Sequence, residues 1–168
     1  MEVRSIEVVI RALNDAGVRY LIVGGLAVMA HGYTRATKDM DLVLDLSEQN
    51  LRRAMTVLAG LGYRPTVPVA MELFADPQIR KQWVAEKGML VFNLFSDAHE
   101  TVEIDLFVEE PFDFAKAYAS AVRDDVVPGV AGIFVGLDDL LFLKRQAGRP
   151  RDLIDIEKLE TLRGSKDG

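Results

Sequence analysis

The chain has 168 residues, of which 49% are hydrophobic and 27% charged, so it can build a packed core and is not a candidate for wholesale disorder. Its net charge of −6 disfavours a protein that wraps duplex DNA by bulk charge, and the absence of cysteine excludes disulfides, thiolate catalysis and cysteine–zinc sites. The start of the chain interleaves charges with apolar residues, unlike a secretory signal, and no apolar run approaches the roughly 20 residues that span a bilayer. We therefore expect a soluble, cytoplasmic protein without a membrane partner, formed by a single domain over residues 1–168.

Helix-like and strand-like patterns alternate along the chain. Apolar residues at spacings of three and four indicate helices, and short apolar runs rich in β-branched residues indicate strands. In chain order, the patterns predict a helix over 3–16, a strand over 18–23, a short helix over 26–32, a strand over 39–46, a helix over 48–60 with Ser47 as N-cap, a turn-rich segment over 60–70, a helix starting at Asp76-Pro77, a hairpin of strands 89–95 and 101–108, a helix over 111–122, a short strand with a turn over 126–136, and helices over 137–148 and 150–163.

Interspersed helices and strands predict an α/β or α+β fold around one mixed sheet. We expect residues 1–136 to form the core of the domain and residues 137–168 to form a helical C-terminal tail. The sequence shows no internal repeat and no linker that would divide it into two domains.

Two aspartates interrupt the apolar strand predicted over 39–46. Asp39 and Asp41 flank Met40, and residues two apart in a strand face the same side, with Cα atoms roughly 6–7 Å apart. Ionising two such carboxylates costs stability unless a positive charge lies between them. Hard oxygen ligands favour Mg²⁺ or Mn²⁺ over zinc in that position.

The strand predicted over 101–108 repeats this pattern. If Val102, Ile104 and Leu106 face the core, Glu103 and Asp105 lie on the other face, and one of them can supply a third carboxylate. Three carboxylates can hold two metal ions about 3.5–4 Å apart, as in enzymes of in-line phosphoryl displacement. The alternative is that these acids are solvent-facing positions of an edge strand, an interpretation that suits Asp45 in particular.

Gly24-Gly25 lies between the first strand and the short helix. Glycines let a backbone approach a phosphate closely, and free N–H groups at a helix start can donate to it. A tight turn without a ligand is the alternative for the glycine pair alone. The phosphate-binding interpretation is favoured by the order of the features that follow, namely the short helix and then Asp39-Met40-Asp41 in an apolar setting.

In that order, the string VGGLAVMAHGYTRATKDMDLVL (23–44) resembles the nucleotidyltransferase superfamily of the polymerase-β type. It is similar to the small bacterial members found in toxin–antitoxin and abortive-infection loci. The stretch LDDLLFLKRQAGRPRDLIDIEKLE (137–160) also looks like the helical tail of those proteins. The resemblance extends over about residues 18–160.

The resemblance implies a role for each residue of the pattern. Gly24 and Gly25 would cradle a triphosphate, Asp39 and Asp41 would ligate metal ions, and Asp105 would complete the cluster and help deprotonate the acceptor hydroxyl. Many catalytic members of the family carry serine at the position of Gly25. Here only backbone donors are present, so either triphosphate affinity is lower or another residue compensates.

Basic and hydroxyl side chains near the pattern are further candidates. Arg35 and Lys144 could neutralise triphosphate charge, and Thr37 could hydrogen-bond a phosphate. Lys144 belongs to the densest basic cluster of the chain, which extends to residue 151. The alternatives are an ordinary polar loop and a solvated helix end in which Asp152 and Asp155 pair with the cations.

Together these features predict a metal-dependent nucleotidyltransferase that moves a nucleoside monophosphate from an NTP to a hydroxyl acceptor and releases pyrophosphate. The acceptor could be RNA, a protein or a small molecule, and a toxin–antitoxin partner protein is a further expectation. One alternative is a non-catalytic protein of the same fold that acts as a binding or antitoxin-like partner; another is a metal-dependent phosphohydrolase. Neither G-x-x-x-x-G-K-[ST] nor G-x-G-x-x-G occurs, so P-loop and Rossmann folds have no support.

Overall fold

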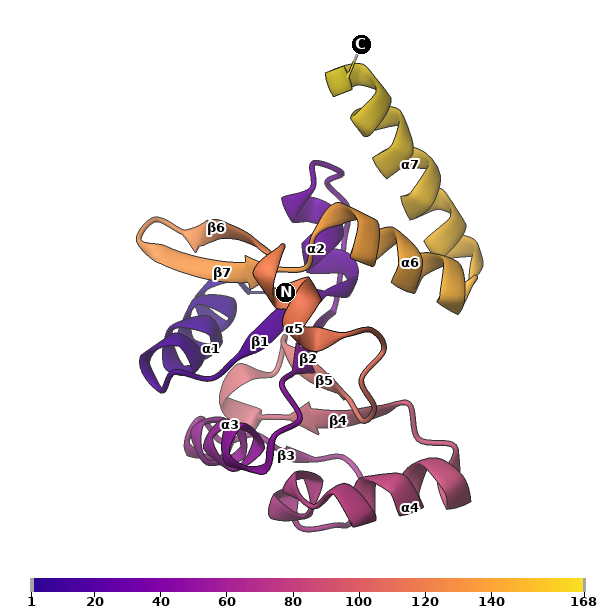
Figure 1. The fold of residues 1–168 in the computed structure, drawn as a ribbon. Helices are drawn as coiled ribbons and strands as arrows, with labels where there is room; N and C mark the ends of the chain where they lie inside the picture. The colour runs from indigo at the N-terminus through magenta and orange to yellow at the C-terminus, as the bar shows by residue number, and fades with distance from the viewer. Residues whose placement is uncertain (1, 168) are drawn as a thin grey trace.

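The computed structural model describes residues 2–167 (Figure 1). Its elements follow in this order: α1 (Val3–Asp15), β1 (Tyr20–Val23), α2 (Gly24–Ala30), β2 (Asp39–Leu44), α3 (Glu48–Gly60), β3 (Arg64–Pro65), the 3₁₀ turn η1 (Met71–Ala75), α4 (Pro77–Lys87), β4 (Val91–Phe95), the 3₁₀ turn η2 (Asp97–His99), β5 (Glu103–Phe107), α5 (Phe114–Ala119), β6 (Val122–Val127), β7 (Val130–Phe134), α6 (Leu137–Ala147) and α7 (Pro150–Asp167).

The strands form one mixed sheet in the order β3-β4-β5-β2-β1-β7-β6. β1 pairs antiparallel with β2, whereas β2 pairs with β5 and β1 pairs with β7 in parallel. The segments between β2 and β5 include α3, α4 and the β4 strand, which then pairs antiparallel with β5. A mixed sheet flanked by helices, with α6 and α7 at the C-terminal end, confirms the predicted fold class.

Apolar burial follows the predicted periodicities. On α1, Val9, Ile10 and Leu13 are buried, as expected for a helix with one apolar stripe. All four residues of β1 are buried, which places this strand in the centre of the core. β2 is also largely buried, so its two aspartates break an apolar strand in the middle of the sheet rather than at its edge.

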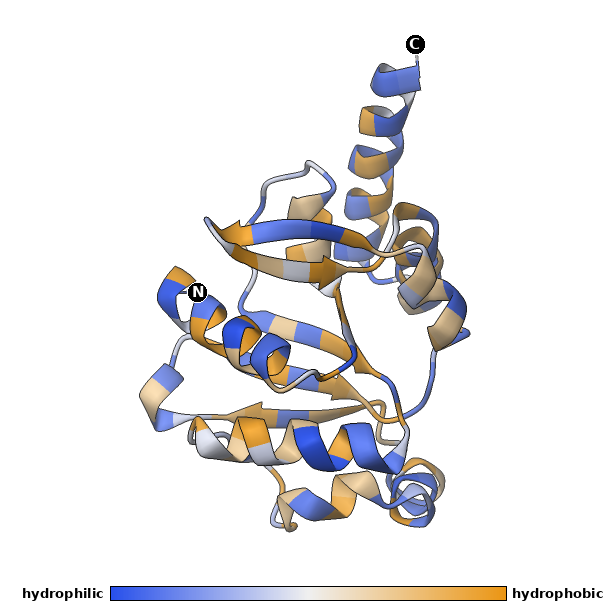
Figure 2. Cartoon of the chain, turned by 60° about the vertical axis from the view of Figure 1, so that its left-hand side comes forward, coloured by the Kyte–Doolittle hydropathy of each residue, from blue (hydrophilic) through white to orange (hydrophobic). Residues whose placement is uncertain are grey.

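The segment after residue 111 departs from the prediction. The helix expected over 111–122 is shorter, α5 covering only Phe114–Ala119, and Val122–Val127 instead forms the edge strand β6, paired with β7 in a hairpin. Figure 2 shows the polar centre of β6 as a blue band between apolar ends. Charged residues on an edge strand are accommodated because one side stays in solvent, and they obscure the apolar pattern by which strands are recognised.

Two smaller differences concern segments near turns. The turn-rich stretch over 60–70 contains the short strand β3, and α2 begins at Gly24, so that the glycine pair forms the first turn of the helix instead of preceding it. Ser47 is at the N-cap position of α3, but its side chain makes no capping hydrogen bond.

The C-terminal helices extend from the sheet beside α2. Gly148 ends α6 with a φ of +60°, a left-handed conformation that glycine adopts without strain, and Pro150 begins α7. In Figure 1 the far end of α7, drawn in yellow, projects away from the rest of the chain. Within residues 2–167, no helix combines the length and apolar character needed to cross a bilayer.

Candidate active site

Two parallel strands bring the predicted acids onto one face of the sheet. In the register of β2 and β5, Asp41 lies opposite Asp105, and Asp39 lies opposite Glu103. Neighbouring strands are about 4.8 Å apart, so each pair is close in space although more than 60 residues separate its members in the sequence. The two strand-borne acid pairs predicted from the sequence are therefore parts of one cluster.

Asp41 lies against the first turn of α2. Gly24 has a φ of +65°, and a Cβ at this position would lie 2.0 Å from Oδ2 of Asp41. Only glycine is compatible with both features, because the conformation is left-handed and the carboxylate fills the space of a side chain. The glycine thus lets the backbone of α2 approach the acid cluster closely.

Burial and mutual repulsion perturb the two acids of β2. The pKa of Asp41 is raised to about 7, first by burial and then by the charges of Asp105 and Asp39, with Lys144 acting in the opposite direction. The pKa of Asp39 is also raised, first by burial and then by Asp105 and Glu103. Without a cation, the cluster therefore retains a proton near neutral pH.

The chemistry of the acid cluster suits a hard divalent cation, but its side chains are not arranged as a preformed metal site. Their donors are carboxylate oxygens, the ligands of Mg²⁺ and Mn²⁺, and two of the carboxylates, those of Asp41 and Asp105, are within hydrogen-bonding reach of each other. Among residues 2–167, however, no three acidic or histidine side chains converge on a common point. Side chains of the cluster would therefore have to move for all three aspartates to share an ion.

An asparagine from the next strand completes the face of the cluster. Asn93 of β4 is in register with Asp105, and its amide nitrogen lies 2.6 Å from Oδ1 of Asp105 and 3.1 Å from Oε2 of Glu103. The sequence analysis did not single out Asn93. A signal was present, since a lone amide interrupts the apolar run MLVFNLF, but its meaning depends on the register of the hairpin.

The loop that enters β2 packs over the second glycine. Gly25 is buried, and a Cβ there would lie 2.5 Å from Oγ1 and 2.7 Å from Cβ of Thr37. The Thr37 hydroxyl also makes a long contact of 3.5 Å with the carbonyl oxygen of Asp39. The structure thus places Thr37 beside both the glycine turn and the first aspartate of the cluster.

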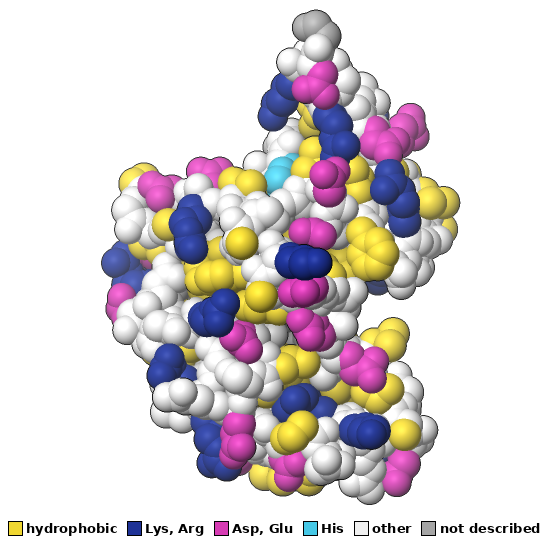
Figure 3. Space-filling view, viewed as in Figure 1, with side chains coloured by type: hydrophobic (Ala, Val, Ile, Leu, Met, Phe, Trp, Pro, Cys, Tyr) yellow, Lys and Arg dark blue, Asp and Glu magenta, His cyan; other side chains and the backbone are white. Residues whose placement is uncertain are grey.

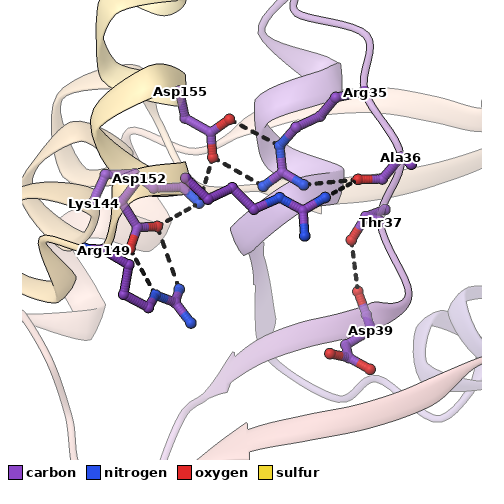
Figure 4. A network of polar contacts seen from close by, with 9 residues as sticks. Arg35, Ala36, Thr37, Asp39, Lys144, Arg149, Asp152 and Asp155 are labelled. Atoms are coloured by element: carbon purple, nitrogen blue, oxygen red, sulfur yellow. Dashed lines mark hydrogen bonds and ion pairs between the residues drawn. The ribbon is translucent and has the colours of Figure 1, made fainter.

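The predicted basic candidates belong to a buried network of ion pairs, drawn in Figure 4. Asp155, whose side chain is 0% exposed, accepts two hydrogen bonds from Arg35, at 2.8 and 2.9 Å, and lies 2.9 Å from Nζ of Lys144. Lys144 also pairs with Asp152 at 3.1 Å, and Arg149 pairs with Asp152 at 2.7 Å. Asp152 and Asp155 are thus the partners considered in the sequence analysis; these aspartates and Lys144 are buried, whereas the side chain of Arg149 is exposed.

This network joins α7 to the loop before β2. The guanidinium groups of Arg35 and Arg151 both donate to the carbonyl oxygen of Ala36. Three cations surround two buried aspartates, so the network keeps a surplus of positive charge beside the acid cluster. Lys144 and Arg149 are close enough for their charges to interact with that of Asp41.

Asp45 lies apart from the acid cluster. It forms an ion pair with Arg19 at 2.9 Å and accepts a hydrogen bond from the backbone N–H of Ser47. The sequence favours a solvent-facing position of an edge strand for Asp45; it lies instead just beyond the central strand β2, and its ion pair keeps it out of the acid cluster. Figure 3 shows acidic and basic side chains gathered where the surface is hollowed between the C-terminal helices and the lobe that contains α4.

Comparisons with known proteins bear on the fold. No protein-family model and no curated protein matches the chain. Two solved structures superpose over nearly the whole chain: ANT(2'')-Ia in complex with adenylyl-2''-tobramycin, with a TM-score of 0.56 and 16% identity over 97% of this chain and 95% of that chain, and the lincosamide antibiotic adenylyltransferase LnuA with lincomycin bound, with a TM-score of 0.61 and 13% identity over 95% and 96%. At such identities the similarity establishes the architecture, and we conclude that the chain has the nucleotidyltransferase fold.

Proposed function

We propose that the protein is a metal-dependent nucleotidyltransferase that transfers a nucleoside monophosphate from an NTP to a hydroxyl acceptor, with release of pyrophosphate. The attacking oxygen of the acceptor forms a bond to the α-phosphorus, the bond from the α-phosphorus to the bridging oxygen breaks, and the acceptor's proton is lost to a base. The observation that supports this proposal most strongly is the register of β2 and β5, which sets Asp105 opposite Asp41 and on the same face as Asp39.

The three aspartates would hold Mg²⁺ or Mn²⁺. A bound divalent cation would supply charge neutralisation at the α-phosphate and lower the pKa of the attacking hydroxyl. Asp105 would receive the proton of that hydroxyl, since it lies opposite Asp41 in the register of β2 and β5. The perturbed pKa of Asp41 supports the proposal, because a cluster that is costly to ionise gains most from a cation.

The triphosphate would lie on the α2 side of the acids. Gly24 and Gly25 would contribute backbone N–H groups, and Thr37 would contribute its hydroxyl, which occupies the space that a side chain at position 25 would need. Arg35 and Lys144 would lie near the phosphates, and the ion-pair network to which they belong keeps one net positive charge, since its three cations face two aspartates.

For the acceptor, a small hydroxylated molecule is the leading candidate. The two superposed structures contain adenylyl-2''-tobramycin and lincomycin, respectively, and their chains are as long as this one within a few per cent. RNA and protein acceptors remain competing outcomes, as does a toxin–antitoxin partner protein.

A non-catalytic binding protein is the second candidate function. It is favoured by the pairing of Arg35 and Lys144 with buried aspartates, which reduces the charge available to a triphosphate, and by the absence of a side-chain hydroxyl at Gly25. Such a protein would retain affinity for its partner after loss of the acids, whereas an enzyme would lose nucleotide binding and turnover.

Calorimetric titration distinguishes the two functions. Each of the four NTPs, with Mg²⁺, is titrated into the wild-type protein, into Asp39→Asn/Asp41→Asn and into the control Asp45→Asn, which changes an aspartate four residues after Asp41 and just beyond β2. We expect binding that depends on Mg²⁺ in the wild type and the control, and none in the double variant. Absence of binding to the folded wild-type protein would contradict the enzymatic proposal.

A further inference from the structure

We propose that Asn93 is a positioning residue that fixes the Asp105 carboxylate for metal binding and proton transfer. The inference rests on the proposed function, because it concerns the same site. It assigns a task to a residue that neither touches the phosphate side of the site nor belongs to the acid cluster.

The contacts of Asn93 use its full donor capacity. One amide nitrogen carries two hydrogens, and it faces two acceptors, Oδ1 of Asp105 at 2.6 Å and Oε2 of Glu103 at 3.1 Å. The amide oxygen in that place would face two carboxylates and repel them, so the partners themselves determine the orientation of the amide. The side chain therefore forms a bridge between the two acids of β5.

Asp105 has few other restraints. Within the described residues 2–167, no lysine, arginine or histidine forms an ion pair with it, in contrast to the aspartates of the ion-pair network. Its side chain is only half-buried, and besides Asn93 its carboxylate contacts that of Asp41. Asn93 thus holds Oδ1 of a carboxylate whose neighbour across the parallel strands is Asp41.

The side-chain amide of Asn93 takes no part in the pairing of the strands. The backbone carbonyl of Asn93 accepts hydrogen bonds from Thr66, and the adjacent Phe92 and Leu94 are fully buried on the opposite face. Replacing the amide leaves these contacts in place. Loss of a hydrogen bond that orients a metal ligand typically costs 10- to 100-fold in metal affinity or activity.

A double-mutant cycle on metal affinity tests the proposal. The Mn²⁺ dissociation constant is measured by water-proton relaxation for the wild type, Asn93→Leu, Asp105→Asn and the double variant, with circular dichroism as a check of folding. We expect Asn93→Leu to weaken Mn²⁺ binding at least tenfold, and to change it less than twofold when Asp105 is already asparagine. Asn93→Thr, which suits a strand, should show the same pattern if the leucine variant folds poorly.

Glu103→Gln provides the matched control. It preserves the shape of the second acceptor while removing its charge, which acts on Asp39, and we expect a smaller loss of Mn²⁺ affinity than for Asn93→Leu because the bridge to Asp105 remains. A larger effect of Glu103→Gln than of Asn93→Leu would show that Glu103, and not Asp105, is the group that Asn93 serves.

Two results would overturn the inference in distinguishable ways. If the wild-type protein binds Mn²⁺ and Asn93→Leu binds it equally well, or if the effects of Asn93→Leu and Asp105→Asn are additive, the positioning role is wrong and the proposed function stands. If the wild-type protein binds no Mn²⁺, the metal-dependent function fails and the inference fails with it.

Discussion

Asp41 combines burial with two acidic neighbours, and this combination carries an energetic cost in the absence of metal. Its pKa of about 7 in the folded protein lies above the ordinary value of 3.8, so folding favours the protonated form. The contribution of Asp41 to stability is therefore complete below about pH 4, is lost progressively as pH rises toward 7, and becomes a full penalty above that value. Such a cost is typical of groups that a site retains for its ligand.

Replacing Asp41 by asparagine should remove this penalty. In metal-free buffer at pH 8 we expect Asp41→Asn to raise the free energy of unfolding by about 2 kcal/mol, a fraction of the full electrostatic penalty because the group is partly solvated. The gain should shrink to near zero at pH 4. Urea denaturation of both proteins across this pH range measures the difference, and a gain that does not change with pH would contradict the explanation.

The close packing of Gly25 and Thr37 makes a second prediction. A methyl group at position 25 would overlap the Thr37 side chain, so we expect Gly25→Ala to lower the free energy of unfolding by about 1–3 kcal/mol. Combining it with Thr37→Gly should recover part of the loss, because the obstructing atoms are then absent. Chemical denaturation of the single and double variants gives the coupling between the two positions.

Gly60→Ala is the control for that series. Gly60 is also helical, and a Cβ there would meet nothing within 4 Å, so alanine should be neutral or stabilising by about 0.5–1 kcal/mol. Equal losses at Gly25 and Gly60 would indicate a general effect of helical glycine substitution and not a specific contact with Thr37.

Among the helices, α7 is connected to the site by ion pairs of its buried aspartates. Asp155 lies on α7, yet its partners Arg35 and Lys144 belong to the loop before β2 and to α6. The same loop is held by Arg151 through the carbonyl oxygen of Ala36. Docking of α7 thereby fixes the segment that leads directly into Asp39, the first of the proposed metal ligands.

Removing the charge of Asp155 should lower the stability of the fold. Because Asp155→Asn leaves two buried cations with one anion fewer, we expect a loss of about 3 kcal/mol in the free energy of unfolding. Glu160→Gln on the same helix is the matched comparison, since its ion pair with Arg145 has side chains 51% and 55% exposed, and its loss should stay below about 1 kcal/mol. Similar losses for the two variants, measured by chemical denaturation, would show that the buried network has no special role.

Ligand binding should stabilise the protein as a unit. A ligand that binds only the folded state stabilises it by about 2.7 kcal/mol when present at 100 times its Kd, which corresponds to a rise in Tm of about 5–10 °C for a domain of this size. We expect this rise with Mg²⁺ and the preferred NTP for the wild type and Asp45→Asn, and none for Asp39→Asn/Asp41→Asn. A rise that persists in the double variant would place nucleotide binding away from the acids.

Much of the fold could be predicted because it depends on local patterns. The stripe on α1, the apolar run of β1 and the capped start of α4 at Asp76-Pro77 are local features, and each is present in the structure. The edge strand β6 was missed because its charged residues face solvent, so no alternation of apolar residues marks it. Burial, rather than strand formation itself, produces the pattern on which the predictions depend.

The site was predictable only in part, for a similar reason. The common face of Asp39 and Asp41 follows from strand geometry alone, whereas the pairing of Asp41 with Asp105 needs a register between distant strands. The bridge from Asn93 and the pairing of Arg35 with Asp155 depend on contacts 12 and 120 residues apart in sequence. Composition and spacing do not contain that information.

The most direct test of the account is anomalous diffraction from crystals grown with Mn²⁺ and a non-hydrolysable analogue of the NTP that binds best. The account predicts manganese density at the oxygens of Asp39, Asp41 and Asp105, with the phosphates on the Gly24 side. Manganese density elsewhere, or nucleotide bound away from these aspartates, would contradict the central claim that this acid cluster is a metal-dependent nucleotidyl-transfer site.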